Sequence, residues 1–369
     1  MYQANIRDLI TKLPQSNKTE HFLMNKFSNQ DEVQQLQQQI SIDLEGQYTK
    51  LLTENKAKLN DYVKVHQDLE PLIKDIESSG ITLNIEKLPG IKEDMLEKAK
   101  NEHHRAKVAQ FFDSLYQALD ATNRLYTQLS LFGTRTHRII TKRFNVQGLP
   151  KAIQQIIVPS QFKKIFTIDF KSFEPSVVAY MTQDQELIEH LNREEGLYDA
   201  LLKELSLDKE KRLFVKRAFI GSFLFGGSYK NPKFKINQYV SEIQWLDAIS
   251  KFTRVVELKK KVEMNKIMAM PYGITHDMSH YQGKSIMAIY VQTVASYIFK
   301  HILLEVYKAQ CAQKSFQIIL PIHDAIMIEC DDEETAQSVA QLMKSKANEL
   351  FKGEFAHVTV EALGGVSNE

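Results

Sequence analysis

The chain has 369 residues, 43% hydrophobic and 25% charged, which is enough to bury a large core in two or three subdomains. The 47 Lys and Arg nearly balance the 46 Asp and Glu, so the net charge of +1 excludes a chain that is strongly basic or acidic throughout. Two cysteines without metal-ligand spacing, no apolar run of membrane length and no signal-peptide pattern after Met1 predict a reduced, cytoplasmic protein with no membrane partner.

Helical patterns dominate the first third of the chain. Residues 1–60 are polar and weakly periodic, and we expect a helical N-terminal segment there. Apolar residues recur at helical spacing over 61–79, and Gly80 ends this helix. Two long helices are expected to follow, over 91–112 and 113–131.

The rest of the chain mixes strands and helices. We predict, in chain order, a strand through Ile168, helices over 175–181, 198–258, 284–310 and 333–351, a hairpin over 316–328 and a last strand over 358–360. Gly226-Gly227 interrupts the long helical stretch, and Met270–Gly273 predicts a turn. This order predicts an α+β fold with helices inserted between two acidic strands.

Two aspartates stand at the ends of strand-like segments. Asp169 follows the apolar run Ile165–Ile168, and Asp324 lies with His323 in the turn of the predicted hairpin. Two aspartates delivered by neighbouring strands can hold two Mg²⁺ ions roughly 3.5–4 Å apart, the arrangement used for phosphoryl transfer. Either aspartate alone would more often be a turn or cap residue.

Basic residues cluster on both sides of Asp169. Segments 133–165 and 211–235 each contain seven Lys or Arg and no Asp or Glu. One such run is usually a solvated face, but two of them around an acidic pair suggest a polyanion path beside a metal site. Arg212 and Lys216 are spaced i, i+4, so one helix face carries two cations that can bind phosphates. An exposed amphipathic helix would give the same spacing.

Six blocks of the sequence, in the right order, resemble the family A DNA polymerases. They are Asp169–Glu174 for the first palm motif, Arg212-x-x-x-Lys216 with Phe225-Gly226 for the fingers motif, Gln292 in the helix before the last motif, Ile322-His323-Asp324 for the third motif, Thr136–Pro150, and Leu69–Ile81 for the start of the thumb. The resemblance covers roughly residues 65–369. It implies a right-hand polymerase fold with an antiparallel palm sheet, a helical fingers insertion and a helical thumb.

The resemblance also implies how the chain is divided. The expected parts are 1–60, a helical segment and a remnant of an exonuclease domain; 61–132, the thumb; 133–205, the first part of the palm; 206–283, the fingers; and 284–369, the second part of the palm. The implied activity is template-directed extension of a primer 3′-hydroxyl with dNTPs, by two-metal-ion nucleotidyl transfer and without proofreading. The implied partners are primer-template DNA and dNTPs.

Individual roles follow from the same resemblance. Asp169, Asp324 and the backbone carbonyl of Phe170 would bind two Mg²⁺ ions. Glu174 would select the deoxyribose sugar. The remaining implied nucleotide-binding residues are Arg212, Lys216, Ile220 (or its neighbour Phe219) and Phe225, and the implied DNA-binding residues are Arg138, Asn145, Gln147, Gln292 and His323.

Some positions depart from the family pattern. His137 replaces a Gly, Ala325 replaces a Glu, and Ile220 replaces an aromatic residue, while Phe225-Gly226 comes one residue later than the usual Tyr-Gly. Met270–Gly273 and His323-Asp324-Ala325 are slightly similar to single-subunit RNA polymerases, so such an enzyme is kept as an alternative, although Glu174 argues against it. The departures leave room for a second alternative, a non-catalytic DNA-binding protein that retains the fold, although both aspartates are present.

Overall fold

The computed structural model describes residues 56–264, 267–269, 275–277 and 284–364. The chain groups into two units, Met1–Asn60 and Asp61–Glu369, and the account below concerns the second. The expected remnant of an exonuclease domain at 1–60, apart from the first turns of a helix that begins at Lys56, and the expected turn at Met270–Gly273 lie outside the described residues.

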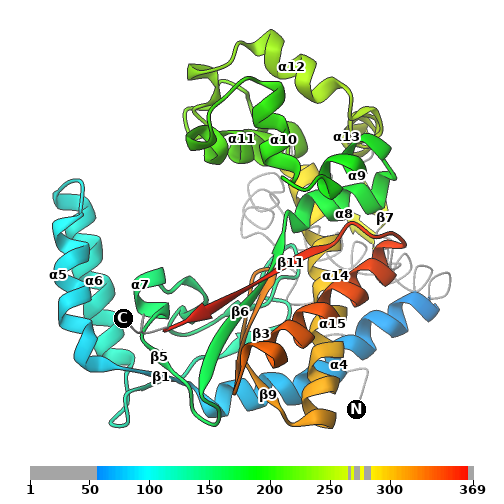
Figure 1. Ribbon diagram of the computed structural model, residues 1–369. Helices are drawn as coiled ribbons and strands as arrows, with labels where there is room; N and C mark the ends of the chain where they lie inside the picture. Colours follow the sequence, from blue (N-terminus) through cyan, green and yellow to red (C-terminus); the bar gives the residue numbers. More distant parts are fainter. Residues whose placement is uncertain (1–55, 265–266, 270–274, 278–283, 365–369) are drawn as a thin grey trace, which may run out of the picture. The chain divides into compact units, whose positions relative to one another are not determined.

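The largest sheet of the described residues has four antiparallel strands in the order β11-β6-β10-β9 (Figure 1). Its strands are β6 (Lys164–Lys171), β9 (Phe316–Ile322), β10 (Ala325–Cys330) and β11 (His357–Leu363). In β6, Asp169 pairs with Ala325 of β10 on one side and with Thr359 of β11 on the other. The sheet therefore brings together the two acidic segments that are far apart in the sequence.

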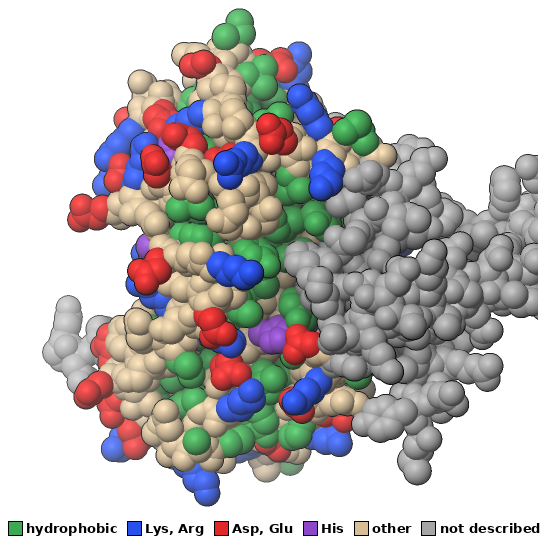
Figure 2. Space-filling view, turned by 90° about the vertical axis from the view of Figure 1, so that its right-hand side faces the viewer, with side chains coloured by type: hydrophobic (Ala, Val, Ile, Leu, Met, Phe, Trp, Pro, Cys, Tyr) green, Lys and Arg blue, Asp and Glu red, His purple; other side chains and the backbone are tan. Residues whose placement is uncertain are grey.

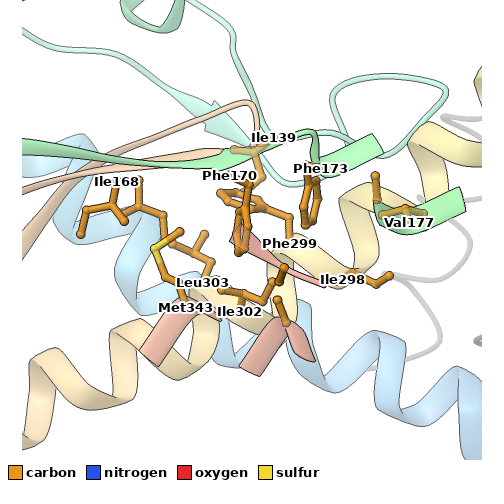
Figure 3. Packing of buried hydrophobic residues seen from close by; sticks show 14 of the residues in the cluster. Ile139, Ile168, Phe170, Phe173, Val177, Ile298, Phe299, Ile302, Leu303 and Met343 are labelled. Atoms are coloured by element: carbon orange, nitrogen blue, oxygen red, sulfur yellow. The ribbon is translucent and has the colours of Figure 1, made fainter. Parts of the chain in front are cut away.

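One face of β6 is buried under two helices, α14 (Lys284–Gln313) and α15 (Glu333–Phe351). Ile168 and Phe170 pack there with Phe299 of α14 and Met343 of α15 (Figure 3). Successive strand side chains point to opposite faces, so the exposed Asp169 lies on the other side of the sheet. Fully burying each large apolar side chain contributes about 1.5–3 kcal/mol, which fixes this choice of faces.

The first helix, α4, spans Lys56–Ser79 and confirms the prediction over 61–79. Gly80 ends it with φ +62, a left-handed conformation that glycine adopts without strain. The helices expected over 91–112 and 113–131 are wrong in their bounds. The structure has α5 (Leu88–Glu97) and α6 (Glu102–Ala118), and the chain then leaves helical structure.

Side chains that compete with helical hydrogen bonding explain these two breaks. Asn101 caps α6 by accepting the N–H of His104 at 2.9 Å. After Ala118, Asp120 accepts the N–H groups of Thr122 at 2.8 Å and Arg124 at 2.9 Å, which closes a turn. The turn leads into short strands that no alternating pattern could reveal, because each is only two or three residues long.

These strands form two small sheets. They are β1 (Ile81–Leu83), β2 (Arg124–Leu125) and β5 (Ile157–Val158) in one sheet, and β3 (Leu129–Ser130) with β4 (Ile140–Thr141) in the other. Short helical turns η1 (Ile85–Lys87), η2 (Val146–Gly148) and α7 (Lys151–Gln154) connect this region.

Helices fill the insertion between β6 and α14. They are α8 (Phe173–Thr182), α9 (Gln185–Asn192), α10 (Leu197–Glu204), η3 (Lys209–Lys211), α11 (Arg212–Ala218), the π-helix η4 (Phe219–Leu224), η5 (Ile236–Gln238), α12 (Glu242–Ser250) and α13 (Thr253–Met264), followed by the strand pair β7 (Ile267–Ala269) and β8 (Thr275–Asp277). Buried Asp184 ties two of them together. Its carboxylate accepts the N–H of Leu187 in α9 at 3.0 Å and of Arg254 in α13 at 2.9 Å.

Helix α14 is the one helix of the described residues that is long and apolar enough to cross a membrane. The apolar segment is Ile286–Gln313, with a mean hydropathy of 1.3 over its most apolar window. The sequence analysis predicted a helix over 284–310 but no apolar run of membrane length, so it missed the apolar character of this helix. In the structure 72% of that window is buried inside the protein, where it covers the sheet, so the helix has the burial of a core helix. The predicted α+β class is confirmed.

Candidate active site

The two aspartates come together because the hairpin β9–β10 pairs with β6. Ala325 lies opposite Asp169 in the ladder, so Asp324, the residue before Ala325, stands beside Asp169 where the ladder ends. His323 and Asp324 form a two-residue turn between the paired residues Ile322 and Ala325. His323 has φ 57, the positive value that tight hairpin turns require at their first position.

The electrostatics of the pair match a cation site. Asp324 is half-buried, and burial together with repulsion from Asp169 and Glu174 raises its pKa to about 6. Asp169 is exposed on the sheet surface, but desolvation by the surrounding protein still raises its pKa, against the opposing charge of Lys216. At neutral pH both carboxylates are charged and repel each other, and a divalent cation between them would relieve that repulsion.

The carboxylates of Asp169 and Asp324 fit Mg²⁺ ions whose remaining ligands come from a bound nucleotide. Within the described ranges, no group of three or more His, Cys, Asp or Glu side chains gathers as a metal site. Two carboxylates suffice when phosphate oxygens and water complete an octahedral shell. Phe170 follows Asp169 in β6, and its N–H lies against the Asp169 carboxylate.

Replacing Asp324 by Asn should stabilise the metal-free protein at pH 8 by about 1–2 kcal/mol, after allowance for screening by solvent. The folded-state pKa of about 6 exceeds the usual 3.8, so ionising Asp324 costs stability as pH rises from 4 to 6. The advantage of Asn is fully present above pH 6 and shrinks as pH falls toward 4. Thermal unfolding in EDTA at pH 8 and pH 4.5 measures it. Equal stability of both proteins at pH 8 would contradict the charge repulsion.

Glu174 lies in the first turn of α8 and is held by two predicted DNA-binding residues. Its Oε1 accepts from Nη2 of Arg138 at 2.7 Å and from Nε2 of Gln292 at 3.3 Å. Ser172, just before the helix, has φ 56, a strained value for a residue with a side chain. The structure therefore brings Arg138 and Gln292 to Glu174, close enough to Asp324 for Glu174 to raise its pKa.

The two cations of α11 share contacts with Tyr198, but only Lys216 is seen to act on an aspartate of the pair. Lys216 is exposed, and its charge acts on the pKa of Asp169. Arg212 is also exposed, but its Nε donates to Asp199 at 2.7 Å. Both lie over the ring of Tyr198, with Arg212 Cζ 5.5 Å and Lys216 Nζ 5.7 Å from its centroid.

Tyr198 is a residue that the sequence prediction missed. Its side chain is buried, and its hydroxyl, near Ser172, Glu174 and Asp324, has no partner of normal hydrogen-bond geometry among the described residues. Burial raises the pKa of Tyr198. An aromatic residue in an apolar helix usually belongs to the core, so the sequence held no signal for this position.

The apolar residues predicted to contact the nucleotide separate into two groups. Phe219 is fully buried against Tyr198, Phe223 and Phe252, so it belongs to the core of the inserted helices. Ile220 and Phe225 are half-buried and keep part of their surface open.

The remaining residues predicted to contact DNA differ in burial and in the hydrogen bonds that they already make. Gln147 is buried; its Nε2 donates to the carbonyl of Pro321 at 2.7 Å and its Oε1 accepts from the N–H of Thr141 at 3.2 Å. It ties the start of the sheet hairpin to the preceding segment, and its contact with DNA stays a prediction. Asn145 and His323 are exposed, although Asn145 Oδ1 also caps η2 at Gly148.

A comparison with family models shows which family the chain belongs to. Residues 20–248 match the model of "DNA polymerase family A", which is more than half of the chain. The chain belongs to DNA polymerase family A. The match includes Asp169, Glu174, Arg212 and Lys216 and ends before the hairpin that carries Asp324. The predicted family is thereby confirmed.

One curated protein and one solved structure are also similar to this family A polymerase chain. DNA polymerase theta of Caenorhabditis elegans is 24% identical over 259 residues, which is 59% of this chain and 15% of that protein. The chain thus spans a small part of that relative. The polymerase domain of Pol1 from M. smegmatis, solved in complex with a DNA primer-template and dNTP, superposes with a TM-score of 0.68 at 16% identity. The superposition covers 81% of this chain and 70% of the other, and it shows the shared fold.

Proposed function

We propose that this chain is a DNA-directed DNA polymerase that extends a primer 3′-hydroxyl with dNTPs by two-metal-ion nucleotidyl transfer. The observation that supports the proposal is the pairing of Ala325 with Asp169, which brings Asp324 close enough to Asp169 for the two carboxylates to repel each other. In this proposal residues 61–132 act as the thumb, 133–205 and 284–369 as the palm, and 206–283 as the fingers.

Each residue of the site has a task in this reaction. Asp169, Asp324 and the carbonyl of Phe170 would hold two Mg²⁺ ions, which would lower the pKa of the attacking hydroxyl and stabilise the leaving pyrophosphate. Lys216 and Arg212 would bind the β- and γ-phosphates and offset the charge that develops on them. Glu174, held in place by Arg138 and Gln292, would stand beside the sugar.

A single-nucleotide extension assay tests the proposal. Four primed templates that differ only at the first unpaired base are each offered one dNTP at a time with Mg²⁺. We expect extension only of the matched template in each set and none in EDTA. Extension that ignores the template base, or no extension by folded protein, would refute the proposed function.

Affinity for primed DNA should fall steeply as salt rises, because Lys and Arg contacts with phosphates release condensed counterions. The net charge of +1 is too small to cause the effect, so we expect it to come from the local basic runs 133–165 and 211–235. On the face that Figure 2 shows, acidic and basic side chains are interspersed. With about five phosphate contacts, the slope of log K against log[salt] would be near −4 to −5. Fluorescence anisotropy between 50 and 300 mM KCl measures the slope. A flat dependence would rule out the DNA path.

The purified chain should show no 3′→5′ exonuclease activity, which is part of the proposal. Metal-dependent exonuclease chemistry needs several carboxylates converging on two ions. The sequence before residue 61 offers only a faint trace of such a set, at Ile42–Leu44. A 5′-labelled primer with a mismatched end, incubated with Mg²⁺ and no dNTP, should stay intact. Degradation that persists in Asp169→Ala would show a separate nuclease site.

A further inference from the structure

The helix that carries Arg212 and Lys216 changes its winding before it ends. Helix α11 passes directly into the π-helix η4, Phe219–Leu224. The N–H of Phe225 donates to the carbonyl of Ile220, five residues back, at 2.9 Å. π-helices are rare and occur mostly as single turns, frequently at functional sites. One extra residue is thus fitted between Ile220 and Phe225 without a break in the helix.

The π turn keeps Phe225 on the helix face of the two cations. Arg212, Lys216 and Ile220 are spaced by four residues and share one face. In a continuous α-helix Leu224 would come next on that face, but Leu224 is fully buried. Phe225 is half-buried like Ile220, and its hydrogen bond to the Ile220 carbonyl places it one turn beyond Ile220. The extra residue of the π turn accounts for the position of Phe225-Gly226, one residue later than the usual Tyr-Gly of the family pattern.

Lys259 of α13 holds the end of this turn. Its Nζ donates to the carbonyl of Phe223 at 2.6 Å and lies 5.3 Å from the centroid of the Phe223 ring. A carbonyl in the last turn of a helix lacks an intrahelical partner, and a lysine ammonium can supply one. The side chain is half-buried, and burial lowers the pKa of Lys259.

Close backbone contacts fix the return of the chain after the turn. The N–H of Gly227 donates to the carbonyl of Gly221 at 2.8 Å, and a Cβ on Gly227 would come within 2.4 Å of that oxygen. A Cβ on Gly221 would come within 2.4 Å of the ring of Phe234. Lys259 is the side chain from α13 that caps this tightly packed turn with a hydrogen bond.

We propose that Lys259 is a positioning residue for the nucleotide pocket. By capping η4, Lys259 keeps the half-buried Ile220 and Phe225 on the helix face that carries Arg212 and Lys216. This one face then offers apolar side chains to the nascent base pair and two cations to the triphosphate. The inference rests on the proposed function. If the turn relaxed to an α-helix, Phe225 would rotate by about 100° around the helix axis and leave this face.

Substitution of Lys259 tests the proposal through nucleotide binding. Lys259→Met keeps most of the side-chain length but removes the donor, and Lys259→Arg keeps a donor. Lys261→Met removes an exposed lysine from the same helix as a matched control. Lys259→Met should raise KM for the matched dNTP about tenfold, with kcat and the Kd for primed DNA within about threefold of wild type. Lys259→Arg should restore most of KM, and Lys261→Met should change nothing.

A deletion separates positioning from a general loss of structure. Removing Ser222 restores four-residue spacing between Ile220 and Phe225, so a plain α-helix would keep Phe225 on the same face. The variant that lacks Ser222 should extend primers near the wild-type rate. When Lys259→Met is added to this variant, KM for the matched dNTP should no longer rise. An equal rise in KM in both backgrounds would overturn the proposal, and so would loss of incorporation by a deletion variant that still folds and binds DNA.

A measurement that does not depend on catalysis tests the same contact. Amide hydrogen exchange over 219–228 should become faster in Lys259→Met and stay unchanged in Lys261→Met. If the wild-type chain fails to extend any primer, the proposed function falls while this result still decides whether Lys259 holds the turn. Unchanged exchange in Lys259→Met would overturn the inference, even if the wild-type chain is an active polymerase.

Discussion

Asp169→Asn and Asp324→Asn should each lower the rate of nucleotide incorporation by at least about 10³-fold while the Kd for primed DNA stays within about threefold. Removing a single preorganised electrostatic group from an active site costs about 10²–10³ in rate, and a ligand shared by two metal ions should cost no less. Glu174 also acts on the pKa of Asp324, but it is bound to Arg138 and is therefore not free to replace Asp169.

Glu361→Gln is the matched control for this pair. Glu361 is an exposed carboxylate of β11 that acts on the pKa of Asp169, and it pairs with Lys151 at 3.7 Å. Its neutralisation changes the local charge as much as either Asn substitution does, but it removes no proposed ligand. We expect incorporation within about threefold of wild type. Near-normal turnover in Asp169→Asn or Asp324→Asn would show that the metal ligands are misassigned.

Glu174→Ala should increase the use of ribonucleotides relative to deoxyribonucleotides by about 10²-fold. Glu174 is fixed by Arg138 and Gln292 near Asp324, where it can exclude a 2′-hydroxyl from a nucleotide bound at the metal site. A site built around such contacts can discriminate strongly between ligands that differ by one hydroxyl. The ratio of kcat/KM for dGTP and GTP, measured with Mg²⁺ on one primed template, gives the change.

Glu174→Gln separates the effect of side-chain size on sugar choice from the effect of charge. Gln keeps nearly the same volume and loses the ion pair with Arg138, so exclusion by size predicts that sugar choice is largely retained. A purely structural Glu174, stabilising the first turn of α8, would contribute about 0.3–1 kcal/mol through the helix dipole and leave the ratio unchanged. An unchanged ratio in Glu174→Ala would bring back the RNA polymerase alternative.

Much of the sheet and its site could be predicted because both depend on local patterns. The strand β6 and the hairpin β9–β10 are long enough for their apolar runs to show, and Asp169 and Asp324 stand where those runs end. The helix α15 was predicted with its observed bounds, because Asp332 caps it and acids fill its first turn.

The features that could not be predicted depend on contacts between distant segments. The pairing of Gln147 with Pro321 and of Glu174 with Arg138 joins residues whose spacing in the sequence carries no signal. In the sequence Tyr198 resembles an ordinary core residue. Only the structure shows that Arg212 and Lys216 lie over its ring. The late Phe225-Gly226 looked like a departure from the family pattern, and only the π turn shows how the helix absorbs it.

The number of metal ions bound in the ternary complex tests the central claim most directly. Mn²⁺ can replace Mg²⁺ and is counted by electron paramagnetic resonance, with the chain bound to a dideoxy-terminated primer-template and the matched dNTP. We predict two tightly bound Mn²⁺ ions per ternary complex in the wild-type chain, with dipolar coupling between them, and loss of that coupling in Asp324→Asn. A count of one or none in the wild-type complex, or an unchanged spectrum in Asp324→Asn, would contradict the assignment of Asp169 and Asp324 as a two-metal site.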